Sequence, residues 1–99
     1  MATITIQSEE QTEKGWRFFV AINEQGDTIT YSVTLDKEYW EELTGSRSHV
    51  LTPKELIRRS FVFLLTKEPK KSILKEFDLR IISRYFSDYE DTIKEHLEQ

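Results

Sequence analysis

The sequence predicts an α+β fold in which an N-terminal three-stranded antiparallel meander is followed by three to four helices packed on one face of the sheet. Two observations support this. The first third of the chain alternates between apolar and polar side chains, whereas the remainder places apolar side chains at helical spacing. Strands followed by helices is an order typical of α+β architectures. We expect one domain over residues 1–99, because each half of a split chain would be too small for a stable core.

The strands are predicted from their period-two patterns. Residues 28–35 alternate strictly between apolar side chains and small hydroxyls. Residues 16–22 follow the same pattern apart from Phe19, and residues 3–7 repeat it weakly. The linking residues 23–27 include a glycine, which suits the positive φ of a hairpin loop. These segments therefore predict a meander of three neighbouring strands.

Helix-start signals follow the last predicted strand. Asp36 is expected to cap a short helix that ends at Gly45. Thr52 then precedes Pro53, and Glu55 stands three residues after the threonine, which together form a capping box with proline at the first helical position. A helix beginning at Pro53 is the best supported local prediction.

The last third of the chain is also expected to be helical. Pro69 should end the preceding helix, because proline disfavours a helical conformation in the residue before it. Helical segments are then predicted over residues 73–77 and 79–86, the second of them capped by Asp78. A second capping box at residues 87–90 predicts a terminal helix.

Charge is unevenly distributed along the chain. Residues 1–46 hold three cations and nine carboxylates, residues 47–84 hold ten cations and four carboxylates, and residues 85–99 hold one cation and five carboxylates. The three zones carry net charges of −6, +6 and −4, which sum to the total of −4. Such segregation steers association with partners but performs no bond chemistry.

Catalytic, cofactor-binding and metal-binding signatures are not found in the sequence. There is no cysteine, and the two histidines, His49 and His96, lie far apart without ligand spacing. Gly15, Gly26 and Gly45 each stand alone, so no phosphate-binding loop is present. Paired carboxylates are adjacent in sequence, whereas acid and base catalysis needs carboxyls held apart in a cleft. The prediction is a protein that is not an enzyme and has no cofactor.

The basic middle zone supplies the candidate contact residues. A surface built from it could bind phosphates if the cations converged. The candidates for contact with a partner or with nucleic acid are Arg47, Arg58, Arg59, Lys70, Lys71, Arg80 and Arg84. The sequence pI of about 5.2 and the acidic flanks argue against nucleic acid. Neutralisation of this basic zone by acidic segments of the same chain, or of a second copy, is therefore favoured over a nucleic-acid interface.

The second half of the chain carries a resemblance. Residues 51–65 and 77–90 are similar to a group of short, uncharacterised bacterial proteins. The resemblance implies a bacterial setting, and it implies no activity and no functional residues. The N-terminus lacks the features of a signal peptide, and no apolar run approaches the length of a membrane-spanning helix, so a cytoplasmic protein without a membrane association is expected.

These observations predict a small non-enzymatic interaction module. Its expected partner is another protein or a second copy of the chain, bound through the charge-segregated surface. Nucleic-acid binding by residues 47–84 is the alternative. The two hypotheses differ in whether the cations of the middle zone gather on one exposed face.

Overall fold

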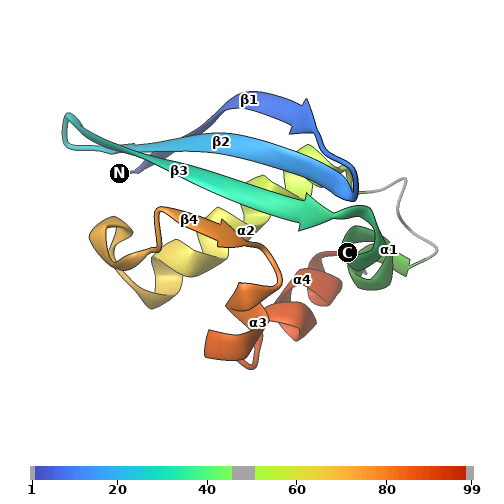
Figure 1. The fold of residues 1–99 in the computed structure, drawn as a ribbon. Helices are drawn as coiled ribbons and strands as arrows, with labels where there is room; N and C mark the ends of the chain where they lie inside the picture. The colour runs from blue at the N-terminus through green and yellow to red at the C-terminus, as the bar shows by residue number, and fades with distance from the viewer. Residues whose placement is uncertain (1, 46–50, 98–99) are drawn as a thin grey trace.

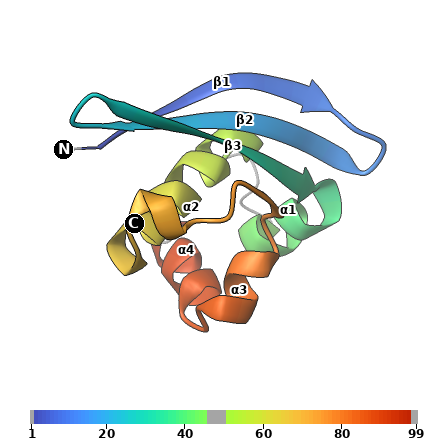
Figure 2. The ribbon, with the colours of Figure 1, turned by 60° about the vertical axis from the view of Figure 1, so that its left-hand side comes forward.

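A four-stranded sheet forms one side of the molecule and the helices form the other. The computed structural model describes residues 2–45 and 51–97, and the two layers separate clearly in both views (Figure 1 and Figure 2). In chain order the elements are β1 (Thr3–Gln11), β2 (Gly15–Glu24), β3 (Asp27–Asp36), α1 (Lys37–Thr44), α2 (Pro53–Lys67), the 3-10 helix η2 (Lys70–Ser72), β4 (Glu76–Asp78), α3 (Ile81–Tyr85) and α4 (Tyr89–Leu97). The prediction of an α+β fold is confirmed.

The first three strands form the predicted antiparallel meander. β1 pairs with β2 and β2 pairs with β3, so that Phe18 lies opposite Val33. Both side chains are fully buried on the face toward the helices. Gln25 and Gly26 connect β2 to β3, and both have positive φ, as a two-residue type I′ hairpin loop requires.

A fourth strand corrects the predicted sheet. β4 joins the free edge of β3 in parallel orientation, with Phe77 opposite Val33. The N–H of Ser32 donates to the carbonyl of Lys75 at 2.8 Å, and the N–H of Leu79 donates to the carbonyl of Thr34 at 2.9 Å. The prediction of a purely three-stranded antiparallel meander is therefore wrong.

The helix predicted over residues 73–77 is absent for the same reason. This segment runs extended so that its backbone can pair with β3, a partner that lies far away in the sequence. A strand of three residues is too short to produce a recognisable alternation. Helical spacing of its apolar residues consequently misled the prediction.

The helix α2 begins as predicted. The Thr52 hydroxyl accepts the N–H of Glu55 at 3.1 Å, and Pro53 occupies the first helical position. Asp36 stands at the N-cap of α1 with extended backbone angles, but its side chain makes no capping hydrogen bond, contrary to the prediction. Gly45 ends α1 with a φ of 56°, as expected for a glycine cap.

The remaining helices are short. α3 has five residues, whereas a helix over residues 79–86 was predicted. Its start is displaced because an oxygen of the Asp78 carboxylate accepts the N–H of Arg80 at 3.0 Å, which holds residues 78–80 in a turn. α4 begins at Tyr89, within the predicted capping box.

Aromatic rings connect the sheet to the helices at the centre of the core. The ring of Phe61 on α2 lies 5.4 Å from that of Tyr31 on β3 and 6.0 Å from that of Phe77 on β4, measured between centroids. Such tilted contacts add to the free energy of burial. The aromatic residues thus supply much of the core.

A buried pair of hydroxyls joins α2 to α4. The Ser60 hydroxyl donates to the carbonyl of Leu56 at 2.7 Å and lies 2.6 Å from the Tyr89 hydroxyl. Because serine has one hydroxyl proton, Tyr89 must be the donor in the second bond. Burial raises the pKa of Tyr89 above its usual value, so this donor keeps its proton.

Candidate functional site

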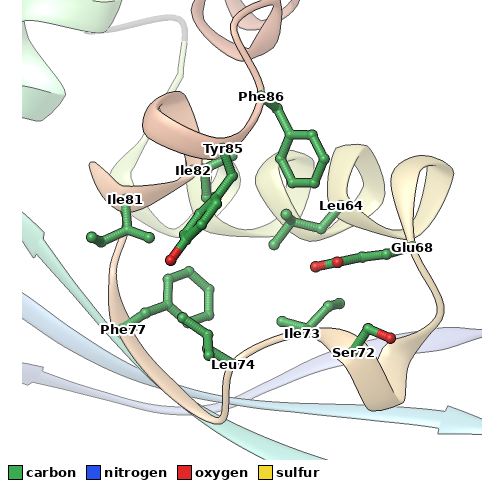
Figure 3. A pocket seen from close by; sticks show the side chains of 10 residues that line it. All are labelled: Leu64, Glu68, Ser72, Ile73, Leu74, Phe77, Ile81, Ile82, Tyr85 and Phe86. Carbon is green, nitrogen blue, oxygen red and sulfur yellow. The ribbon is translucent and has the colours of Figure 1, made fainter.

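An apolar groove opens on the helical side of the molecule, between the end of α2, the η2–β4 connection and α3. It encloses about 380 Å³. Figure 3 shows the ten side chains that line it, which are those of Leu64, Glu68, Ser72, Ile73, Leu74, Phe77, Ile81, Ile82, Tyr85 and Phe86. Apolar grooves of this size with a few polar groups are typical of binding sites.

Local sequence signals place the walls of the groove. Pro69 has no N–H to continue α2, and the chain turns through η2 immediately afterwards. The connection then runs extended into β4, which the edge of β3 fixes. α3 follows directly and is too short to cover the connection. Three short elements therefore surround the end of α2 without closing over it.

The groove has a buried floor and an exposed rim. Leu64, Ile73 and Ile82 are at most 4% exposed and belong to the core. Leu74 and Tyr85 on the rim are 53% and 70% exposed. Two large apolar side chains exposed beside one depression form a patch that a partner could cover, unlike single apolar residues scattered over a surface.

Three polar groups border the groove. The carboxylate of Glu68 points toward its middle, and hydroxyls come from Ser72 and Tyr85 (Figure 3). Within residues 2–45 and 51–97, no hydrogen bond joins either hydroxyl to a base. A nucleophile needs such a base within hydrogen-bond reach. The three polar groups could form hydrogen bonds with a molecule that enters the groove.

Two of the predicted contact residues, Arg58 and Arg59, lie on α2 and share a carboxylate. Their Nε atoms lie 3.9 and 3.8 Å from the oxygens of Glu55. Arg58 also donates to the carbonyl of Ile4 on β1 at 2.8 Å. A carbonyl on an edge strand that already accepts a hydrogen bond is less available for pairing with another strand. Arg58 therefore serves the fold by covering part of this edge.

Lys70 is buried and not available as a surface contact. Its side chain is only 7% exposed, and the ammonium lies 3.6 Å from Glu24 and 3.5 Å from Asp27. Its carbonyl accepts the hydroxyl of Tyr31 at 2.6 Å. A lysine is buried in this way only when it is paired, and here it ties η2 to the β2–β3 hairpin.

The other predicted contact residues are dispersed. The guanidinium of Arg80 stacks 4.8 Å from the ring centroid of Tyr39. Lys71 and Arg84 are exposed, and no ion pair of either occurs in the part of the chain that the structure describes. Arg47 lies outside the described residues. The structure thus brings Arg58 and Arg59 together and separates them from Lys70 and Arg80.

Polar contacts of the remaining helices are structural. The Tyr39 hydroxyl on α1 donates to Glu90 on α4 at 2.8 Å. Burial, followed by this hydrogen bond, raises the pKa of Tyr39 far above its usual value. Lys67 bonds Asp88 at 2.8 Å, and this bond holds the pKa of the Asp88 carboxyl below its usual value. Both pairs fix neighbouring elements to one another.

No group of three or more potential metal ligands occurs among residues 2–45 and 51–97. His49 and the side chain of His96 lie outside the described part. No helix in that part has both the length and the apolar character needed to cross a membrane.

Sequence reasoning missed the groove. Ile73 and Leu74 fall in one segment that was predicted to be helical, and Tyr85 and Phe86 fall in another. The sequence holds no local signal for the groove, because adjacent apolar residues such as Leu56 and Ile57 are both fully buried on one helix elsewhere in the chain.

Comparison with known proteins gives no further identification. No family model matches the chain, and neither the curated proteins nor the solved structures contain a significant match. The resemblance of residues 51–90 to short bacterial proteins stays a prediction.

Proposed function

We propose that this chain is a non-enzymatic module that binds another protein through the groove at the end of α2. The observation that carries the proposal is the rim, where Leu74 and Tyr85 expose apolar surface beside a floor of core residues. Covering such a rim removes apolar area from water and is favourable by about 25 cal/mol for each Å². A partner side chain that fills the depression would contribute most of the binding energy.

The segregated charges contribute less than the groove does. Lys70 of the basic zone pairs with Glu24 and Asp27 of the acidic N-terminal zone. Lys67 pairs with Asp88 of the acidic tail. In these contacts, carboxylates of the two acidic zones neutralise cations of the basic zone of the same chain. Less of the segregated charge is therefore left for a partner.

Nucleic-acid binding has less support for the same reason. Arg58, Arg59, Lys70 and Arg80 all contact groups of their own chain. A phosphate backbone requires several free cations along one surface. Only Lys71 and Arg84, among the predicted contacts within the described residues, make no such contact.

Self-association through the groove is also disfavoured. A two-fold dimer places the same patch of both copies face to face. Both copies would then bring a Glu68 carboxylate into one interface, and Lys67 and Lys70, the cations nearest to Glu68 in sequence, already pair with other carboxylates of their own chain. A different protein is therefore the favoured partner over a second copy.

The test compares capture by the wild-type chain with capture by Leu74→Asp and Val62→Asp. Val62 is the matched control, because it is also 53% exposed but lies outside the groove on α2. A charge on the rim opposes burial in an apolar interface. We expect a protein in a lysate of the native cells to be retained by wild type and Val62→Asp and lost with Leu74→Asp.

Sedimentation of the purified chain accompanies this capture experiment. Equal retention by Leu74→Asp and wild type, or no retained protein at all, would overturn the proposal. A dimer that Leu74→Asp dissociates would replace the proposed partner by a second copy. Circular dichroism shows whether each variant is folded, and Tyr85→Ser gives an independent change at the rim.

A further inference from the structure

The groove carries one charge that its own chain does not neutralise. Among the ten residues that line the groove, Glu68 is the only one that carries a charge at neutral pH. Its carboxylate points into the groove (Figure 3), and no ion pair or hydrogen bond of this carboxylate occurs within residues 2–45 and 51–97. A carboxylate next to apolar surface is stabilised when a cation reaches it.

The nearest basic residues in sequence are used elsewhere. Lys67, one position before Glu68, bonds Asp88 at 2.8 Å and lies over the ring of Phe63. Lys70, two positions after it, is buried against Glu24 and the hairpin. These fixed contacts leave Glu68 to an incoming group. Neither lysine is among the residues that line the groove.

We infer that the groove selects a partner segment in which a large apolar side chain stands next to a lysine or arginine. The apolar side chain would fill the space over Leu64 and Ile73 between the rim residues. The basic side chain would reach Glu68 at the α2 end, with its methylene stem lying along the apolar wall. This inference rests on the proposed function, because it assumes that a protein segment occupies the groove.

The charges around the groove indicate where the basic residue of the bound segment would lie. Lys71, Lys75 and Arg84 are exposed and neighbour lining residues in sequence. Exposed charges of this kind are screened by salt more strongly than partly buried ones. Glu68 is half-buried and lines the groove itself, whereas the three cations do not. The preference for a cation should consequently be local to the α2 end of the groove.

The experiment is a selection of displayed random 12-residue peptides on the full-length chain. Parallel selections use Glu68→Gln, Glu68→Lys and Leu74→Asp, with Glu76→Gln as a control for the loss of a nearby exposed carboxylate outside the groove. Wild type and Glu76→Gln should enrich peptides that combine a Leu, Phe, Ile, Met or Trp with a neighbouring Lys or Arg. Glu68→Gln should keep the apolar preference and lose the basic one.

Fluorescence polarisation of one selected peptide then gives the magnitude. Its dissociation constant should rise about fivefold with Glu68→Gln, the range of a partly exposed ion pair, and should not change with Glu76→Gln. Replacing the basic residue of the peptide by glutamine should produce the same loss on wild type and no further loss on Glu68→Gln. Glu68→Lys should prefer an acidic residue at that peptide position.

The outcomes separate the two proposals. Apolar peptides enriched without a basic residue, or an equal basic preference on Glu68→Gln, would overturn this inference and leave the protein-binding groove in place. No enrichment on wild type, or identical enrichment on Leu74→Asp, would overturn both.

Discussion

The two ends of α2 differ in how completely the rest of the chain covers them. From the first end of α2 to just past its middle, Leu56, Ile57 and Phe61 lie beneath the sheet and are fully buried. At the last end, Leu64 forms the floor of a groove whose rim is open to water. The sheet is long enough to cover the first end, whereas β4 and α3 have three and five residues and do not cover the last. Exposed apolar surface thus arises where the covering elements are short.

The largest expected difference between the two ends comes from Phe61→Ala at the covered end. Phe61 is fully buried and contacts Tyr31 and Phe77, so its removal leaves a cavity between sheet and helix. We expect the free energy of unfolding to fall by about 3–5 kcal/mol. Urea denaturation monitored by circular dichroism measures this free energy. A loss below about 1 kcal/mol would contradict the tight packing described for this end.

High pH should also act on the buried pair of hydroxyls that joins the middle of α2 to α4. Burial raises the pKa of Tyr89 from its usual value of 10.0. Below pH 10 the folded and unfolded states both keep the proton, and the stabilisation is fully present. Above pH 10 only the unfolded state ionises, so the free energy of unfolding should fall by about 1 kcal/mol per pH unit from this residue. Urea titrations between pH 9 and 11 on wild type and Tyr89→Phe test it, and a slope unchanged by the substitution would be evidence against it.

Thr52→Ala tests the start of the covered end. The substitution removes the acceptor for the N–H of Glu55 and leaves that donor to water. We expect a loss of about 1 kcal/mol in the free energy of unfolding, as for other N-cap residues. Thermal denaturation provides the measurement. The exposed neighbour Lys54→Ala, which removes no capping bond, should be close to neutral and serves as the control.

Leu74→Ala at the open end should have the smallest effect on stability. Because the side chain is 53% exposed, we expect a change of about 0.5 kcal/mol or less. The same variant should weaken partner binding, since it removes part of the rim. A change in stability as large as that of Phe61→Ala would show that the two ends do not differ as described.

How much the sequence could predict depended on the distance between interacting residues. Thr52, Pro53 and Glu55 lie within four positions, and the start of α2 was predicted correctly from them. β4 depends on the edge of β3, where Thr34 bonds Asp78 across 44 positions. A pairing of that kind leaves no local pattern, and the segment was therefore predicted to be helical.

The candidate site was predicted less well than the fold. The candidate cations could be identified from the sequence, but their partners could not, because Lys70 meets Glu24 from a distant hairpin. Leu74 and Tyr85 had the character of core residues, and only the short length of α3 leaves them exposed. Whether a side chain is exposed depends on the whole fold and cannot be inferred from the residues next to it in the sequence.

The parallel pairing of β4 also sets an order of assembly. The meander consists of neighbouring hairpins that close short loops, whereas β4 must close a loop of 44 positions at a greater entropic cost. During synthesis the meander can therefore form before the last third of the chain has left the ribosome. The groove exists only after β4 has docked and α3 has followed it. A partner that recognises the groove would thus distinguish a finished molecule from an incomplete one.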